Sequence, residues 1–252
     1  MLSLLRRWRE RRILDRHPIA EADWRAVLSS SAAVRRLPAS DQARLRVMAT
    51  LLLQEKSLEP ARGLRLTSAM SARIAALACL PVLNLGLSWY RQWHSVVVYP
   101  ETFVPEREEM DSAGVVHRGH TPLTGEAWQH GPVILAWDAV ERAGSPPGHN
   151  VVIHEMAHKL DMLNGEANGY PPLHANMRRR EWTRALDSAY RELGRQADYG
   201  EASALDTYGL ENPGEFFAVA SEAFFEAPRR LKDFSLGLYE QLALFYRQQP
   251  LG

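Results

Sequence analysis

The sequence is poor in cysteine and has no net charge. Cys79 is the only cysteine among 252 residues, so the chain can form no internal disulfide and no metal site built from several thiolates. Thirty lysines and arginines balance thirty aspartates and glutamates, which leaves no net positive field to hold a phosphate backbone. We therefore expect no direct nucleic-acid partner.

Long apolar runs are also missing. The longest, residues 74–87, is interrupted by Pro81 and falls short of the roughly 20 residues that cross a bilayer. The segment MLSLLRRWRERR has few apolar residues before its arginines and lacks the features of a secretory signal. Its arginines and apolar residues predict a basic helix, either solvated or bound to a membrane surface or an acidic partner. We expect no membrane span and a cytoplasmic location.

The remaining pattern predicts an α+β fold with helices around a small mixed sheet. Residues 20–80 read as helices, while the β-branched and aromatic runs 96–99 and 133–137 predict strands separated by a hairpin or loop region. Helix signals follow at about 150–164, 173–194, 213–226 and 236–248. Helices on both sides of a few strands are typical of α+β proteins.

Residues 154–158, HEMAH, follow the pattern His-Glu-x-x-His. Helical residues four apart share a face, so His154 and His158 can reach one metal ion with Glu155 beside it. Such a site suits Zn²⁺, which lowers the pKa of its water and polarises a carbonyl group. Glu155 would take the proton of the water and pass it to the leaving amine. The flanking apolar residues predict a buried helix, where these polar groups would be costly without a ligand.

The motif leaves the third protein ligand open. Asp161 shares the histidine face, but seven helical residues rise about 10.5 Å, whereas a ligand lies about 2 Å from zinc. We therefore expect Asp161 either to orient His158 or to lie at the surface. Glu215 is the candidate from another helix and Glu222, two turns further along it, is the rival. A structural alternative for Glu215 is a capping box with Asn212.

The segment HEMAHKLD, with TYGLENPGEFFAVASEAFFE and GEAWQHGPVILAWDAV, resembles the Mlc titration factor A family of bacterial zinc metallopeptidases. That family is itself similar to the catalytic domain of anthrax lethal factor. The similarity continues through LPVLNLGLSWY and VVVYPETF and covers roughly residues 70–230. It implies a zincin-like fold with the motif on a central helix, and Zn²⁺ held by His154, His158 and Glu215. It also implies Glu155 as general base and Tyr208 as a donor to the oxyanion.

Two functions follow from these observations. The resemblance implies a zinc-dependent aminopeptidase that acts on peptides and also binds a transcription repressor of the Mlc type. The alternative is a non-catalytic regulatory protein that sequesters the repressor and keeps zinc as a scaffold. Glu155 favours the enzyme, because a scaffold site needs no general base.

We further expect one compact unit, in which a mainly helical region, residues 1–95, packs on a zincin-like catalytic region, residues 96–252. The strand at 133–137 is expected either to pair with an extended substrate or to be an interior strand. We assign no role to the scattered histidines His117, His120, His130 and His149.

Overall fold

The computed structural model describes residues 2–102, 107–110, 116–119, 125–128 and 131–251. This part of the chain forms eleven α-helices, three 3₁₀ helices and six strands. The α-helices are α1 (Leu2–Arg16), α2 (Glu21–Ser30), α3 (Ala32–Arg35), α4 (Ala39–Glu55), α5 (Ser68–Cys79), α6 (Trp137–Glu141), α7 (Val151–Asp161), α8 (Arg179–Asp198), α9 (Pro213–Glu226), α10 (Pro228–Phe234) and α11 (Leu236–Tyr246). The 3₁₀ helices are η1 (Leu87–Tyr90), η2 (Met162–Asn164) and η3 (Thr207–Leu210).

The main sheet has the strand order β1-β2-β6-β5. Its strands are β1 (Ser57–Pro60), β2 (Ser95–Tyr99), β6 (Val133–Ala136) and β5 (Gly125–Ala127). The first three are parallel, and β5 is antiparallel to β6 at the edge. Val96 and Val98 of β2 and Val133 and Leu135 of β6 are buried, as expected for the apolar residues of central strands. A separate antiparallel pair is formed by β3 (Arg107–Met110) and β4 (Val116–Gly119).

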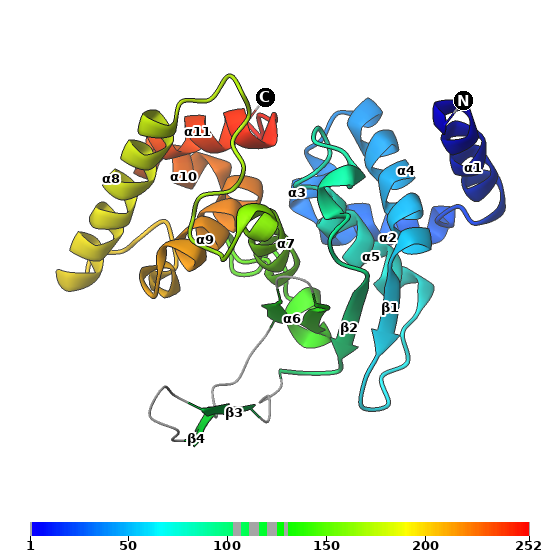
Figure 1. The fold of residues 1–252 in the computed structure, drawn as a ribbon, viewed down its shortest axis with the longest axis horizontal. Helices are drawn as coiled ribbons and strands as arrows, with labels where there is room; N and C mark the ends of the chain where they lie inside the picture. Colours follow the sequence, from blue (N-terminus) through cyan, green and yellow to red (C-terminus); the bar gives the residue numbers. More distant parts are fainter. Residues whose placement is uncertain (1, 103–106, 111–115, 120–124, 129–130, 252) are drawn as a thin grey trace.

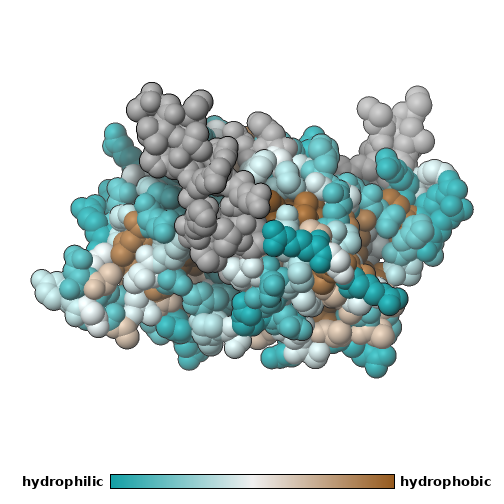
Figure 2. Space-filling model, turned by 90° about the horizontal axis from the view of Figure 1, so that it is seen from below, coloured by the Kyte–Doolittle hydropathy of each residue, from teal (hydrophilic) through white to brown (hydrophobic). Residues whose placement is uncertain are grey.

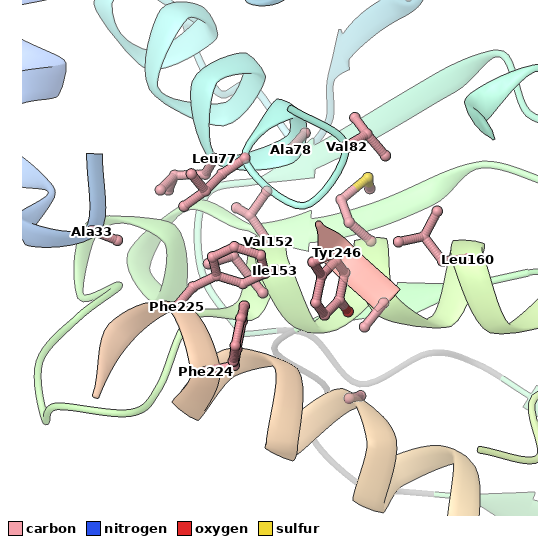
Figure 3. Packing of buried hydrophobic residues seen from close by; sticks show 14 of the residues in the cluster. Ala33, Leu77, Ala78, Val82, Val152, Ile153, Leu160, Phe224, Phe225 and Tyr246 are labelled. Atoms are coloured by element: carbon pink, nitrogen blue, oxygen red, sulfur yellow. The ribbon is translucent and has the colours of Figure 1, made fainter. Parts of the chain in front are cut away.

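Helix α7 lies in the middle of the molecule, between the C-terminal helices and the N-terminal half (Figure 1). It packs against α9, α5, β5 and β6. Its apolar residues Val152, Ile153 and Leu160 join Phe224 and Phe225 of α9 in one hydrophobic core (Figure 3). The helix that carries the histidines is therefore held from several sides, which fixes its side chains.

The expected α+β class and small mixed sheet are confirmed. Two local expectations are wrong. Ser57–Pro60, inside a stretch read as helical, is strand β1, because its backbone pairs with β2. Helix α8 begins at Arg179 instead of residue 173, after a segment that opens with Pro171 and Pro172, which favour extended backbone. The division into residues 1–95 and 96–252 stays a prediction.

The strand expected at 133–137 is β6, and it is interior because it pairs with β2 on one side and β5 on the other. The prediction that a substrate pairs directly with this strand is therefore wrong. The edge of the described sheet next to α7 belongs to β5.

The face of the molecule seen from below is shown in Figure 2. This face is mostly hydrophilic, with small hydrophobic patches between polar residues (Figure 2). Helix α1 forms as expected, and the guanidinium of Arg12 lies 5.3 Å from the centre of the Trp8 ring. Among the described helices, none has the length and hydropathy of a membrane span.

Candidate metal centre

Two helix starts bring the candidate residues together. Asn150 caps α7, and its side chain accepts a hydrogen bond of 3.2 Å from the backbone N–H of Ile153. Asn212 caps α9 in the same way, accepting from the backbone N–H of Glu215 at 3.0 Å. Glu215 therefore stands in the first turn of α9, opposite the face of α7 that carries the histidines.

His154, His158 and Glu215 form one compact group. Nε2 of His154 lies 2.9 Å from Oε2 of Glu215 and 3.1 Å from Nε2 of His158. Nε2 of His158 lies 3.3 Å from the same Glu215 oxygen. Two ligands about 2.0 to 2.1 Å from a tetrahedral metal ion are about 3.3 Å apart. The three atoms thus have nearly the spacing of ligands that share one metal ion, and the Glu215 side chain is engaged here instead of in a capping box.

The chemistry of the donor set also fits a cation. Oε1 of Glu222 lies 2.8 Å from Nδ1 of His154. A neutral His154 with its proton on Nδ1 would present a lone pair on Nε2 to the Glu215 carboxylate and the ring nitrogen of His158, so the group needs a positive charge at its centre, either a proton or a metal ion.

The pKa shifts of His154 and Glu215 also indicate that a positive charge stabilises this three-residue group. Burial lowers the pKa of His154, but the hydrogen bonds to Glu215 and Glu222 outweigh it and raise the pKa well above its ordinary value. For Glu215 burial raises the pKa, but the bonds to His154 and His158 outweigh it and bring the pKa far below its ordinary value. A metal ion held by these three residues would satisfy both groups.

Glu222 lies on the other side of the His154 ring. Its Oε1 contacts Nδ1 of His154, and its Oε2 accepts a hydrogen bond from the backbone N–H of Asn150. The group of ligand atoms found in the described residues contains Glu215 and not this rival. A carboxylate bound to the distal nitrogen of a ligand histidine fixes the tautomer and orientation of the ring.

Asp161 does neither of the two things expected of it. It is fully buried, so the surface interpretation is wrong. Its Oδ2 accepts hydrogen bonds from the backbone N–H groups of Asn168 and Gly169, at 2.8 and 2.7 Å. Its Oδ1 and Nδ1 of His158 both lack a hydrogen-bond partner in the described part of the chain. Asp161 therefore holds the loop after α7, and the expected hydrogen bond to His158 is not formed.

Glu155 lies beside the three-residue group and is almost completely buried. Burial raises its pKa to about 8, although the positive charge on His154 lowers it. Oε2 of Glu155 has no hydrogen-bond partner among the described residues. The side chain lines a cleft of about 870 Å³ together with His154, His158 and Glu215. A carboxyl group of this kind can exchange a proton with a molecule in the cleft.

Tyr208 is also in the wall of this cleft, on η3. Asp206 caps this short helix by accepting from the backbone N–H of Tyr208 at 2.9 Å. The Tyr208 ring centre is 6.1 Å from that of His154. Burial and then the nearby Glu215 raise the pKa of Tyr208 to about 12. Its hydroxyl is therefore protonated at neutral pH and can donate a hydrogen bond.

Among the other histidines, His149 lines the cleft, and its Nδ1 is 3.6 Å from Oδ2 of Asp206. His117 is in β4, while His120 and His130 lie outside the described residues. Two residues near the site were not assigned a role from the sequence. Gly125 lies against the Glu155 side chain, and the ammonium group of Lys159 donates to the backbone carbonyl of Gly131. The only signal for Lys159 was its spacing of four residues from Glu155.

Comparison with known proteins also points to a metal-dependent protein. The model of the family described as glucose-regulated metallo-peptidase M90 matches residues 5–247. A protein of Yersinia enterocolitica serotype O:8 / biotype 1B named Mlc titration factor A is 40% identical over 234 residues, 92% of this chain and 87% of that protein. Proteins of the same name from Yersinia pestis and Yersinia pseudotuberculosis are 40% identical over 215 residues, 84% of this chain and 79% of theirs. The resemblance seen in the sequence is confirmed.

Proposed function

Because this chain belongs to the family of glucose-regulated metallo-peptidases M90, we propose that it is a zinc-dependent peptidase. The observation that carries the proposal is the set of three facing atoms from His154, His158 and Glu215, separated by 2.9 to 3.3 Å. Two imidazole nitrogens and one carboxylate oxygen are a catalytic zinc set that leaves a fourth position open. We assign the fold to the zincin-like class on the same basis, with the motif on the central helix α7.

The residues around the zinc would carry the proton transfers of peptide hydrolysis. Bound zinc would supply a Lewis acid for the scissile carbonyl and lower the pKa of water. Glu155 takes a proton from the attacking water and returns it to the leaving amine. A raised pKa suits a group that must do both, and a divalent cation beside it favours the ionised form that begins the reaction. The protonated hydroxyl of Tyr208 donates to the oxyanion.

We propose that the substrates are peptides cut near their amino end. The cleft has a volume of about 870 Å³, and Gly125, Glu126 and Ala127 of the edge strand β5 line it. Asp206 and Glu211 line the cleft beyond the metal group. Their charge favours a cationic amino terminus.

A regulatory role is proposed beside the peptidase activity. The relatives are named Mlc titration factor A, and we propose that this chain likewise binds a transcription repressor of the Mlc type, in the cytoplasm. The alternative function is sequestration of the repressor without catalysis. The buried Glu155 next to the metal group favours the enzyme, since a scaffold for a partner needs no base there.

The test is a cleavage assay on a peptide library with and without a chelator, together with metal analysis of the purified chain. We expect one zinc per chain, hydrolysis that stops when zinc is removed, and recovery when zinc is added. Glu215→Gln should lose zinc and activity, whereas Glu211→Gln, a glutamate in the same cleft wall, should keep zinc. Hydrolysis that is insensitive to the chelator would overturn the proposal. Repressor binding without hydrolysis would support the alternative.

A further inference from the structure

Helix α7 has a second face that bears on the site, formed by Val151, Glu155 and Lys159. These residues are spaced by four, so they lie in one row along the helix. The row packs against β5, whereas His154 meets Glu215 and Glu222 of α9. The side of α7 that carries the candidate base is thus also the side that holds the edge strand.

Lys159 ties the far end of β5 to the helix. Only 3% of the residue is exposed. Its Nζ donates to the backbone carbonyl of Trp128 and, at 2.9 Å, to that of Gly131. Trp128 and Gly131 belong to the connection between β5 and β6, where the N–H of Gly131 donates to the carbonyl of Trp128. Because a buried ammonium group is costly without partners, this connection is held where Lys159 reaches it.

Gly125 brings the near end of β5 directly against Glu155. A Cβ atom added at Gly125 would lie 2.5 Å from Oε1 of Glu155 and 2.7 Å from Cγ2 of Val151. Real Cβ atoms essentially never make contacts that short. A side chain at residue 125 would therefore force the Glu155 carboxyl group, the Val151 side chain or the β5 backbone to shift.

We propose that Lys159 and Gly125 are positioning residues that set the backbone of β5 against the carboxyl group of Glu155. Lys159 acts through the β5–β6 connection, and Gly125 acts by leaving room for Glu155. The inference rests on the proposed role of Glu155 as base. The attachment of β5 itself can be measured without any activity.

The first arm of the test compares Lys159→Met with Lys56→Met. Lys56 is a matched control, because it is also buried and donates to two backbone carbonyls, those of Tyr90 and Trp93, at 2.6 and 2.5 Å. Hydrogen exchange of the amides of residues 126–128 should accelerate at least about tenfold in Lys159→Met, since a lost hydrogen bond to a charged group has an effect of that order. It should stay unchanged in Lys56→Met, and Lys159→Arg should restore part of the protection. Zinc content should be the same in all three.

Unchanged exchange in Lys159→Met, or equal acceleration in both methionine variants, would overturn the role of Lys159. If Lys159→Met does not fold, Lys159→Arg is compared with wild type. Faster exchange of residues 126–128 in Lys159→Arg would support the role of Lys159, and equal exchange would overturn it. For peptide substrates we expect a rise in KM with Lys159→Met that Lys56→Met does not reproduce.

The second arm compares Gly125→Ala with Gly194→Ala, where an added Cβ meets nothing closer than 3.8 Å. Gly125→Ala should keep its zinc and its KM but lose about 100-fold in kcat, because displacement of a catalytic group by about 1 Å has that effect. A crystal structure of Gly125→Ala should show the Glu155 side chain displaced. An unmoved Glu155 with full activity would overturn the inference. If the wild-type chain hydrolyses no peptide, the peptidase proposal fails, while exchange and crystallography still decide whether β5 is positioned in this way.

Discussion

Oε1 of Glu222 lies 2.8 Å from Nδ1 of His154. The other nitrogen of the same ring is 2.9 Å from Glu215. The two glutamates of α9, separated by two helical turns, thus bind opposite ends of one imidazole. Their roles must differ, because only Nε2 faces His158 and the centre of the metal group.

The first prediction separates the two glutamates by metal affinity. Glu222→Gln should weaken zinc binding about 10- to 100-fold, the usual effect of losing a carboxylate that orients a ligand histidine. Glu215→Gln should weaken it much more, because a ligand atom is lost. Competition with a chromophoric chelator measures both affinities. A larger loss in Glu222→Gln than in Glu215→Gln would contradict the assignment of the third ligand.

The second prediction concerns the buried Asp161. Burial raises its pKa from the ordinary 3.8 to about 6, although the N–H groups of Gly169 and Asn168 lower it. The folded chain therefore holds the Asp161 proton more tightly than the unfolded chain, and the free energy of unfolding falls as the pH rises from about 4 to about 6. Asp161→Asn cannot ionise. Relative to this variant, wild type should lose about 3 kcal/mol across that range, since one pKa unit corresponds to about 1.4 kcal/mol.

Urea denaturation at several pH values measures this difference. It should be done on chelator-treated protein, because a cation bound near His158 would itself lower the pKa of Asp161. Asp187→Asn, a change at an exposed residue of α8, serves as the control. A difference between wild type and Asp161→Asn that does not change with pH would contradict the prediction.

The two helices of the site could be predicted because their signals are local. Asn150 before the apolar run of α7, and Asn212 with Pro213 before α9, mark helix starts that the structure reproduces. The His-Glu-x-x-His spacing then places both imidazoles on one face. These features need only helix geometry, so the sequence suffices for them.

The rest depends on contacts between distant residues. Sequence spacing left Glu215 and Glu222 as rivals, and only the packing of α9 on α7 shows which nitrogen of His154 each one meets. Strand β1 exists because it pairs with β2, a partner some forty residues away. Asp161 was expected either to orient His158 or to lie at the surface, but its carboxylate accepts from a loop that returns to it after the helix ends. None of these contacts leaves a local pattern.

The third prediction concerns Tyr208, which is proposed to donate to the oxyanion. Tyr208→Phe removes the hydroxyl and keeps the ring of a residue that is 43% exposed in the wall of the cleft. Loss of one such donor typically lowers turnover about 100- to 1000-fold. Zinc content and thermal stability should stay unchanged, because the hydroxyl is not part of the metal group. Wild-type turnover in Tyr208→Phe would leave this residue with a packing role only, and Tyr199→Phe, an exposed tyrosine at the end of α8, is the control.

The last prediction decides between the peptidase and the sequestering protein through Glu155, which lies beside the metal group without belonging to it. Glu155→Gln keeps the size and polarity of the side chain and removes its basicity, so zinc content, fold and affinity for a repressor should survive. If the chain is a peptidase, hydrolysis should fall by at least about 100-fold, the contribution of a positioned general base. If it only sequesters a repressor, wild type should show no zinc-dependent hydrolysis, and both forms should bind the repressor equally. Turnover and repressor affinity measured on the same two preparations separate these outcomes, and equal zinc-dependent hydrolysis by wild type and Glu155→Gln would refute Glu155 as the base.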